Sequence, residues 1–160
     1  GTRAASRQRK RGSDWTWGDL QICRFEIWRF MPPHIKVDLQ RCTGCRTCEQ
    51  VCAFAHEGLF GPARARIRVL RRDVLTLEAR VCTHCDEAYC VDACPTEALT
   101  RRGDKTVFEA GLCTGCGACV EVCDLLFWDE EREQPLICDL CGECVRRCPE
   151  GALLLVTHAT

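Results

Sequence analysis

Seventeen of the 160 residues are cysteine, and sixteen of these fall into four groups of four, here called the first to fourth quartets. Three quartets share the spacing C-x2-C-x2-C-x3-C, and the second has a longer gap of four residues before its third cysteine. Cysteine sulfur forms disulfides and binds soft metal ions, so these residues carry the chemistry to be explained. The quartets are Cys42, Cys45, Cys48 and Cys52; Cys82, Cys85, Cys90 and Cys94; Cys113, Cys116, Cys119 and Cys123; and Cys138, Cys141, Cys144 and Cys148.

The spacing favours iron–sulfur clusters over disulfides and zinc. A disulfide scaffold usually has an even number of scattered cysteines, whereas here one short spacing recurs. Zinc sites use two C-x2-C pairs separated by a loop and need no third cysteine three residues further on. Three close cysteines followed by a single one are the bacterial ferredoxin pattern, in which the fourth cysteine ligates a different cluster. The quartets therefore predict four [4Fe–4S] clusters. The spacing leaves open whether the quartets pair sequentially or in a nested order.

Composition excludes several other classes of protein. Without cysteine, the apolar share is only about a third, so the apolar core is small for a globular chain. No stretch approaches the roughly 20 apolar residues of a membrane-spanning helix, and no secretory signal is visible, which predicts a cytoplasmic protein with no membrane span. The net charge of −1 gives no basic footprint for nucleic acid.

Residues 1–30 differ from the rest of the chain. They hold seven Lys or Arg and three Asp or Glu, whereas residues 31–160 carry a net charge of −5. Because Met31 is the only methionine, the segment before it reads as a disordered extension or a misplaced start. The alternative is a docking arm anchored by aromatic residues. Its cysteine, Cys23, is predicted to be a free thiol and not a ligand. The aromatic residues are Trp15, Trp17, Trp28 and Phe30.

From Met31 onward, short strands alternate with cysteine loops. Two hairpins are predicted, around Arg71-Arg72-Asp73 and around Gly103-Asp104, and short helices are predicted over residues 49–55 and near Val120. Residues 35–37 and 152–156 read as strands that can pair with each other. Such pairing brings the first and last quartets together and favours the nested order. The expected fold class is α+β. The strands of the hairpins are expected over residues 67–70, 74–77, 99–101 and 106–108, with a further extended segment over 135–137.

The sequence resembles a known family. The order of the quartets, the longer gap in the second and the segment Cys94-Pro95-Thr96-Glu97-Ala98 are similar to the four-cluster iron–sulfur subunits of the dimethyl sulfoxide reductase type. The segments 42–49 and 54–58 look most like small subunits of tungsten aldehyde oxidoreductases and benzoyl-CoA reductases. The resemblance covers about residues 31–160. The chain is short for this family and lacks its C-terminal membrane anchor.

The resemblance implies nested pairing, with two pseudo-symmetric ferredoxin-like modules of two clusters each. The inner module is expected at about 79–124, and the outer module at about 31–78 plus 125–160. The implied ligands are Cys42, Cys45, Cys48 and Cys148 for cluster 1; Cys52, Cys138, Cys141 and Cys144 for cluster 2; Cys82, Cys85, Cys90 and Cys123 for cluster 3; and Cys94, Cys113, Cys116 and Cys119 for cluster 4.

Clusters with four thiolate ligands exchange electrons but leave no open position for a substrate, so the chain is expected to relay electrons and not to catalyse alone. The resemblance implies a large catalytic partner that uses a tungsten or molybdenum pterin. A flavin or NAD subunit, or another copy of the chain, is a further expected partner. The alternatives are a free polyferredoxin and, in another class, a multi-zinc interaction module.

Other residues near the quartets are expected to act around the clusters. His56 and His84 could donate hydrogen bonds to cluster sulfur but are not expected to be ligands. Phe127 and Trp128 are predicted to pack in the core or at an interface. Two roles are considered for a run of arginines: a solvated basic stretch or a docking surface for an acidic partner. These are Arg64, Arg66, Arg68, Arg71 and Arg72. Glycines within the cysteine loops are expected to let backbone N–H groups point at sulfur, namely Gly44, Gly115, Gly117 and Gly142.

Overall fold

The structure is a computed structural model that describes residues 32–157. The extension over residues 1–30, with Cys23 and its aromatic residues, lies outside the described residues. In chain order the elements are β1 (His34–Val37), α2 (Thr47–Glu57), η1 (Pro62–Arg64), β2 (Ile67–Arg71), β3 (Leu77–Val81), α3 (Tyr89–Asp92), β4 (Leu99–Arg102), β5 (Lys105–Phe108), η2 (Ala110–Leu112), α4 (Ala118–Glu121), β6 (Phe127–Asp129), β7 (Gln134–Leu136), α5 (Glu143–Arg146) and β8 (Leu153–Val156).

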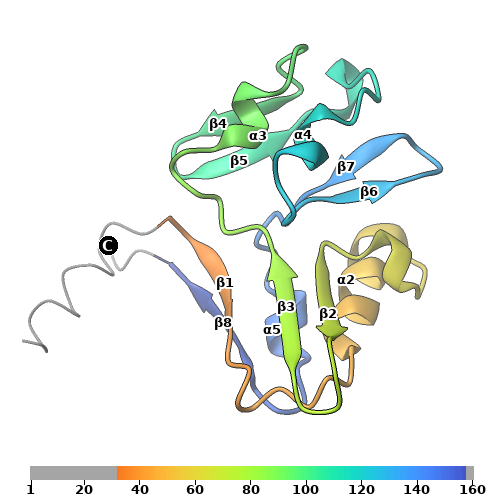
Figure 1. Ribbon diagram of the computed structural model, residues 1–160, viewed down its shortest axis with the longest axis vertical. Coiled ribbons are helices and arrows are strands. Elements are labelled where there is room, and N and C mark those ends of the chain that lie inside the picture. Colours follow the sequence, from red (N-terminus) through yellow and green to blue (C-terminus); the bar gives the residue numbers. More distant parts are fainter. Residues whose placement is uncertain (1–31, 158–160) are drawn as a thin grey trace, which may run out of the picture. The chain divides into compact units, whose positions relative to one another are not determined.

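Strands β1 and β8 join the two ends of the described chain (Figure 1). They pair in an antiparallel register in which His34 faces Val156 and Val37 faces Leu153. Ile35 and Leu153 are buried, so each strand turns part of its surface toward the core. The predicted pairing of residues 35–37 with 152–156 is confirmed. It brings together the first quartet, which follows β1, and the fourth quartet, which precedes β8.

The β2–β3 hairpin differs from the prediction in its second strand. That strand was expected over residues 74–77, whereas β3 begins only at Leu77. The reason is Asp73, whose carboxylate accepts the backbone N–H groups of Leu75 and Thr76 at 2.8 Å. This Asx-type turn keeps Val74 and Leu75 in the loop, where both are exposed.

Two further hairpins complete the strands of the described part. The β4–β5 hairpin turns at Gly103, which has a φ of 60°, and pairs Leu99 with Phe108 as the sequence predicted. The β6–β7 hairpin was only half anticipated, because β7 was expected and β6 was not. Its pair Phe127 and Leu136 is buried, so this hairpin closes the core on one side.

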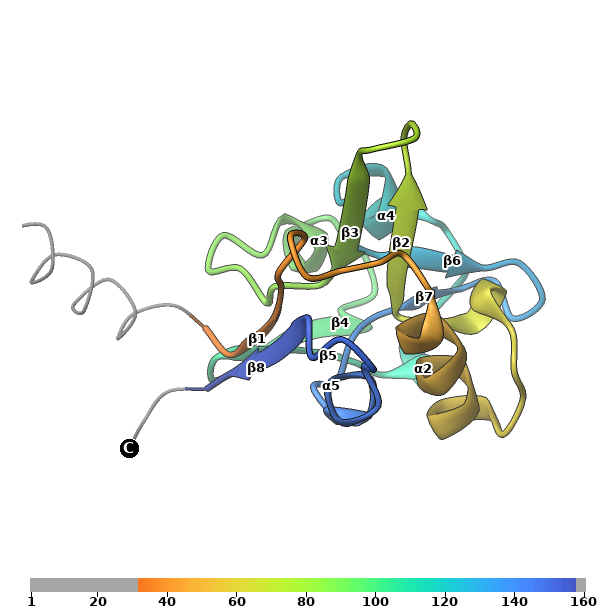
Figure 2. The ribbon, with the colours of Figure 1, turned by 90° about the horizontal axis from the view of Figure 1, so that it is seen from below.

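The helices are short and pack in two pairs. α2 ends at Gly58, which has a φ of 69° and whose N–H bonds to the carbonyl of Phe54. α2 packs against α5 although they lie far apart in the sequence, and α3 packs against α4 (Figures 1 and 2). Each helix carries the third cysteine of one quartet in its first turn. The four cysteine loops are therefore gathered into two groups.

Cysteines make up much of the buried core. Seven of them belong to one continuous cluster of buried residues that also contains Ile67, Val69 and Leu99. A shortage of aliphatic side chains is thus offset by sulfur, as the composition predicted. The buried cysteines are Cys48, Cys52, Cys82, Cys90, Cys119, Cys138 and Cys144.

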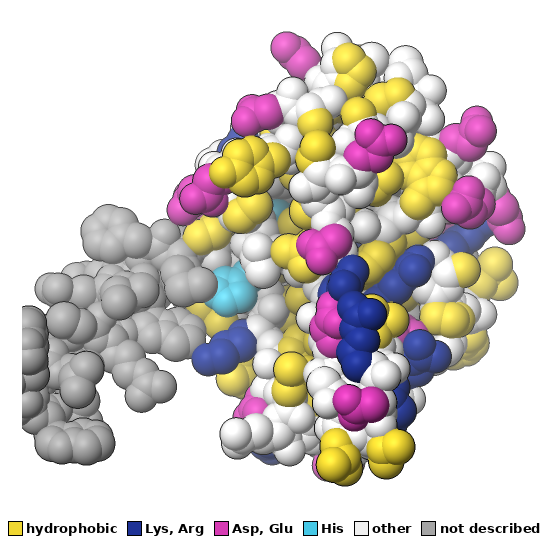
Figure 3. Space-filling view, viewed as in Figure 1, with side chains coloured by type: hydrophobic (Ala, Val, Ile, Leu, Met, Phe, Trp, Pro, Cys, Tyr) yellow, Lys and Arg dark blue, Asp and Glu magenta, His cyan; other side chains and the backbone are white. Residues whose placement is uncertain are grey.

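Charged side chains are unevenly distributed over the face shown in Figure 3. Arginine and lysine side chains gather over the part that contains β2, β3 and α2, whereas the charged side chains over α3 and α4 are mainly acidic. The same division appears in the sequence. Residues 82–124 hold eight Asp or Glu and three Lys or Arg, a net charge of −5.

Candidate metal centres

The four cysteine loops share one backbone conformation. A left-handed residue with a φ between 50° and 72° lies between the first and second cysteines of each quartet, and another directly precedes each helix. Alternating right- and left-handed residues turn successive N–H groups to one side, which makes a cradle for an anionic group. The first position is occupied by Gly44, His84, Gly115 and Leu140, and the second by Arg46, Ala88, Gly117 and Gly142.

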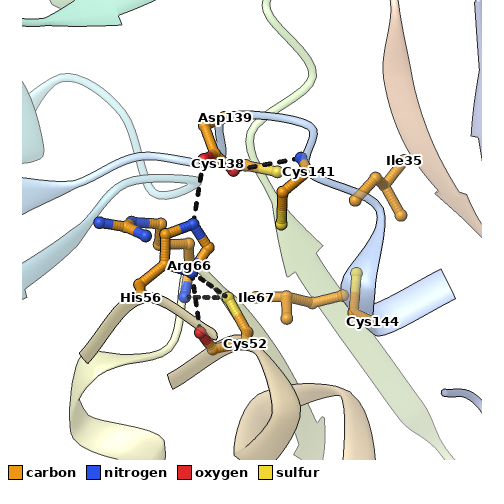
Figure 4. A pocket seen from close by; sticks show the side chains of 9 residues that line it. All are labelled: Ile35, Cys52, His56, Arg66, Ile67, Cys138, Asp139, Cys141 and Cys144. Atoms are coloured by element: carbon orange, nitrogen blue, oxygen red, sulfur yellow. Dashed lines mark hydrogen bonds and ion pairs between the residues drawn. The ribbon is translucent and has the colours of Figure 1, made fainter. Parts of the chain in front are cut away.

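Sulfurs from two different quartets meet in one cavity (Figure 4). Cys138 and Cys141 come from the loop after β7, Cys144 comes from α5, and Cys52 comes from α2. The first three cysteines of the fourth quartet thus lie with the last cysteine of the first quartet. The other residues that line this cavity are Ile35, His56, Arg66, Ile67 and Asp139.

A second cavity has the same composition. Its lining includes Cys113, Cys116 and Cys119, the first three cysteines of the third quartet, together with Cys94, the last cysteine of the second. Leu99, Phe108, Trp128 and Pro135 are among its mainly apolar walls. Trp128, which was predicted to pack in the core or at an interface, is half-buried against this cavity.

The other two predicted ligand sets do not line either of these two cavities. The electrostatic effects of their cysteines on one another's pKa values indicate which of these sulfurs lie close together. The pKa of Cys82 is raised to about 12, first by burial and further by the neighbouring sulfurs of Cys90, Cys138 and Cys123; that of Cys90 is raised to about 11 by burial and then by Cys123 and Cys85. Cys123 of the third quartet therefore lies near two cysteines of the second. In the first quartet, burial and then Glu49 raise the pKa of Cys48 to about 12.

Several sulfurs already accept hydrogen bonds from the backbone. The N–H of Arg66 donates to Cys52 Sγ at 3.3 Å, that of Ala152 to Cys148 Sγ at 3.3 Å, and that of His84 to Cys82 Sγ at 3.5 Å. Hydrogen bonds of this kind stabilise a thiolate and tune the potential of a cluster that it ligates. The hydroxyl of Thr47 lies 3.4 Å from Cys45 Sγ, and these contacts with Thr47 lower the pKa of Cys45.

The buried thiols fit an iron–sulfur group. Burial raises the pKa of Cys138 and Cys144 to about 12 and of Cys90 and Cys119 to about 11, so at neutral pH these groups are protonated in the absence of metal. Bound iron supplies the positive charge that makes a buried thiolate favourable. Grouped sulfurs, apolar walls and N–H donors are together what a [4Fe–4S] cluster requires.

His56 lies at one side of the cavity in Figure 4 and bonds to residues of two segments that line it. Its Nδ1 donates to the carbonyl of Cys52 at 2.8 Å, and its Nε2 lies 3.0 Å from the carboxylate of Asp139. The other oxygen of Asp139 accepts the N–H of Cys141 at 3.2 Å. The imidazole thus ties α2 to the loop of the fourth quartet. Asp139 was not singled out in the sequence, because a single acidic residue in a loop gives no signal.

His84 occupies a position where glycine stands in two of the other loops. It is 1% exposed, and its Nδ1 accepts the backbone N–H of Thr106 at 3.0 Å. Burial lowers the pKa of His84, so the imidazole is neutral and its proton lies on Nε2. His84 therefore joins the second cysteine loop to β5. The carbonyls of His84 and Cys85 also accept hydrogen bonds from Arg101.

The run of arginines is mostly occupied within the protein. Arg64 pairs with Glu57 and Glu131, Arg72 pairs with Glu78, and Arg71 donates to the carbonyl of Val74. The guanidinium carbon of Arg68 lies 4.5 Å from the centre of the Phe127 ring. Arg66 lines the cavity in Figure 4. These internal contacts do not favour a docking surface for an acidic partner.

Within the described residues, no helix has the length and apolar character needed to cross a membrane.

Comparisons with known proteins agree with this chemistry. Residues 74–124 match the model of a 4Fe-4S dicluster domain, and residues 33–54 and 138–152 match models of 4Fe-4S binding domains. The polyferredoxin-like subunit of aliphatic sulfonate oxidoreductase from Pyrococcus furiosus is 36% identical over 82% of this chain and 78% of its own length.

Two other similar proteins belong to oxidoreductases. One of the subunits of tetrathionate reductase from Salmonella typhimurium is 33% identical over 73% of this chain and 50% of its own length. A chain of the BamBC active-site complex of benzoyl coenzyme A reductase, a solved structure with benzoyl-CoA, is 29% identical. That match has a TM-score of 0.46 and covers 77% of this chain and 78% of that one.

Proposed function

Because the chain belongs to the family of [4Fe–4S] electron-transfer subunits of oxidoreductases, we propose that it holds four such clusters and relays single electrons between a catalytic subunit and a redox partner. It is an iron–sulfur subunit and is not catalytic alone.

The observation that carries the proposal is the mixing of quartets in the two cavities. Each cavity combines the first three cysteines of one quartet with the last cysteine of another. Sequential pairing puts Cys52 with the second quartet, whereas nested pairing puts it with the fourth. The lining of the cavity in Figure 4 supports the nested order.

The proposed ligand sets follow the nested order. Coupling of Cys90 with Cys123, and the packing of α2 against α5, support the two sets that share no described cavity. The sets are Cys42, Cys45, Cys48 and Cys148; Cys52, Cys138, Cys141 and Cys144; Cys82, Cys85, Cys90 and Cys123; and Cys94, Cys113, Cys116 and Cys119. Cys23 is proposed to ligate no cluster.

From the nested order we also propose that the protein is divided into two modules. The inner module, about 79–124, contains the packed helices α3 and α4. The outer module, about 31–78 plus 125–160, contains α2, α5 and the β1–β8 pair, which connects its two separate segments. The extension over residues 1–30 is proposed to lie outside both modules.

When bound, a [4Fe–4S] cluster supplies a site that accepts and gives up one electron. The chain holds each sulfur in place on a short helix or a strained loop, excludes water with apolar walls and directs backbone N–H groups at sulfur. These features limit the structural change around a cluster when it gains or loses an electron. They also tune the reduction potential of each cluster. The sulfurs grouped in the two modules thus mark the proposed path of electrons through the protein.

The catalytic partner is proposed to be a large subunit with a tungsten or molybdenum pterin, on the basis of the family resemblance of the quartets. A flavin or NAD subunit is the proposed source or acceptor of electrons at the other end. Since the oxidised clusters need reduced thiols for assembly, we place the complex in the reducing cytoplasm. Metal analysis of the complex co-purified from its native host tests the tungsten or molybdenum assignment.

The ligand sets are tested by substitution and EPR. Anaerobically purified protein is reduced stepwise, and its cluster signals and iron content are measured for Cys52→Ala, Cys138→Ala and the double variant. Nested pairing predicts that all three lose or alter the same signal, because both cysteines bind one cluster. If Cys52→Ala instead removes the signal that Cys85→Ala removes, pairing is sequential.

Cys23→Ala is the matched control and should leave the iron content and all signals unchanged. A brown protein with about sixteen irons supports four clusters. A colourless protein that contains zinc excludes the proposal. Isolation as a single active chain, with no large subunit in a native pull-down, favours a free polyferredoxin.

A further inference from the structure

The negative charge of the described protein is concentrated at one end. Residues 82–124 carry a net charge of −5, whereas the rest of the described chain contains equal numbers of acidic and basic residues. Figure 3 shows the acidic side chains spread over the part that contains α3 and α4. Each bound cluster with four thiolates adds further negative charge, but the proposed clusters are divided equally between the two modules, so the difference in charge between them remains.

Five of these eight acidic residues have no ion-pair partner within the described protein, and three of the five lie at the ends of short helices. Asp92 ends α3, Glu121 ends α4, and Glu109 directly precedes η2; all three are exposed. Nearby Asp86 and Asp124, by contrast, are engaged by Arg101 and Arg80. The negative charge of a surface carboxylate without an ion-pair partner is not neutralised by the protein. Such a carboxylate can therefore attract an approaching protein of positive charge.

Exposed apolar side chains lie among these carboxylates. Tyr89 is 64% exposed, and Leu112 and Val122 are each 51% exposed. Tyr89 begins α3 and Val122 directly follows α4, and these two helices pack together. We call this surface the acidic face; it consists of Tyr89, Asp92, Glu109, Leu112, Glu121 and Val122.

The acidic face lies beside one of the sulfur-lined cavities. Leu112 directly precedes Cys113, and Glu121 and Val122 directly follow the first turn that contains Cys119. Cys116 of the same cavity is exposed. A protein seated on this face would therefore approach the cluster-binding cavity more closely than one seated on the distant β2–β3 turn.

We propose that the acidic face docks a diffusible redox protein whose own docking surface is rich in lysine or arginine. This inference rests on the proposed electron-transfer function. A permanent subunit interface is more apolar and poor in Asp and Glu, whereas charged rims accelerate short-lived encounters. The acidic face has a few apolar residues within a charged surround, which suits a transient partner.

A lysine-rich cytochrome c serves as the probe. The holo protein is reduced with dithionite, and in a stopped-flow experiment each encounter moves one electron from a reduced cluster to the ferric haem, which becomes ferrous. The second-order rate constant is expected to fall about tenfold or more as ionic strength rises from about 20 to about 500 mM. Succinylated cytochrome c, with its lysines made acidic, should react slowly at low salt and faster at high salt.

Two variants that make the same change in net charge test where the cytochrome docks. Glu109→Gln/Glu121→Gln is expected to lower the low-salt rate constant about fivefold and to flatten its salt dependence. Glu150→Lys makes the same change in net charge at an exposed position outside residues 82–124 and should change the rate less than twofold. Equal effects of both variants, or a wild-type rate independent of salt, overturn the acidic face as the docking surface.

Iron content and EPR signals are measured on every sample before kinetics. A sample without iron–sulfur signals contradicts the proposed function itself. If a sample has its full iron–sulfur content but its rate constant is unchanged in Glu109→Gln/Glu121→Gln, only the docking inference is contradicted. The two failures are therefore distinguished by measurements on the same protein.

Discussion

The carboxylate of Glu49 accepts the backbone N–H of Val69 at 2.6 Å, in the interior of the protein. Glu49 is 1% exposed and lies next to Cys48, while Val69 lies at the centre of β2. Arg46, whose Nε lies 3.6 Å from the same carboxylate, provides the balancing charge. One buried acid thus fixes the helix of the first quartet to the hairpin beside it.

Replacing Glu49 by alanine should destabilise the holo protein by about 2–3 kcal/mol, because the N–H of Val69 would lose its acceptor in a buried place. Thermal unfolding monitored at the cluster absorbance measures the effect. Glu49→Gln keeps an acceptor oxygen and should cost less. Glu150→Gln, at an exposed position, is the control and should leave the melting temperature unchanged; a similar loss there would contradict the structural role of Glu49.

Gly115→Ala should impair the third cysteine loop more than Gly117→Ala does. Both glycines have left-handed backbone, with φ values of 72° and 75°, so each alanine adds about 1 kcal/mol or more of strain. At Gly115, however, a Cβ would also lie 3.1 Å from the carbonyl oxygen of Glu133, whereas at Gly117 the space is open. Iron content after anaerobic reconstitution and the unfolding midpoint compare the two variants. Equal losses would show that the close approach to Glu133 has no effect.

Glu97→Gly should stabilise the protein by about 0.5–1 kcal/mol. Glu97 is exposed and has a φ of 54°, a conformation that glycine adopts without the strain of a side chain. The gain is reduced by the greater freedom of glycine in the unfolded chain. Denaturant unfolding measures it, and Glu121→Gly in α4 should have the opposite sign because glycine weakens a helix. A loss of stability at both positions would argue against strain at Glu97.

Removal of iron should unfold most of the described protein. Seven buried cysteines belong to the continuous core and are proposed cluster ligands, so removing the iron takes away the groups that would join their loops. Anaerobic treatment with a chelator is expected to abolish cooperative thermal unfolding and protease resistance. A matched sample incubated without chelator is the control. A stripped protein that keeps both properties would show that its aliphatic core is sufficient.

The sequence predicted the parts of the fold whose signals are local and repeated. Regular cysteine spacing predicted the loops, and the apolar segments at 35–37 and 152–156 predicted the β1–β8 pair. The position of β3 could not be read from residue types, because the side chain of Asp73 sets where the turn ends. β6 was missed since a strand of three residues gives too short a pattern to recognise.

Residues that hold the cysteine loops in place by hydrogen bonds are harder to predict than the cysteine ligands themselves. Glu49, Asp139 and Thr106 gain their roles from partners distant in the sequence, and their residue types do not indicate these contacts. A glutamate in an amphipathic helix normally faces solvent, so burial of Glu49 contradicts the usual expectation. His84 was noticed only because it lies within a cysteine loop, and its bond to Thr106 depends on the folded position of β5.

The pairing of β1 with β8 also determines the order in which the protein is completed on the ribosome. The hairpins β2–β3, β4–β5 and β6–β7 each join neighbouring segments and can form soon after they emerge. β1 is synthesised before all of them, yet its hydrogen-bonding partner is the last strand of the described chain. Throughout translation its edge therefore stays open to wrong partners, so this protein needs protection of its earliest strand until its latest one is made.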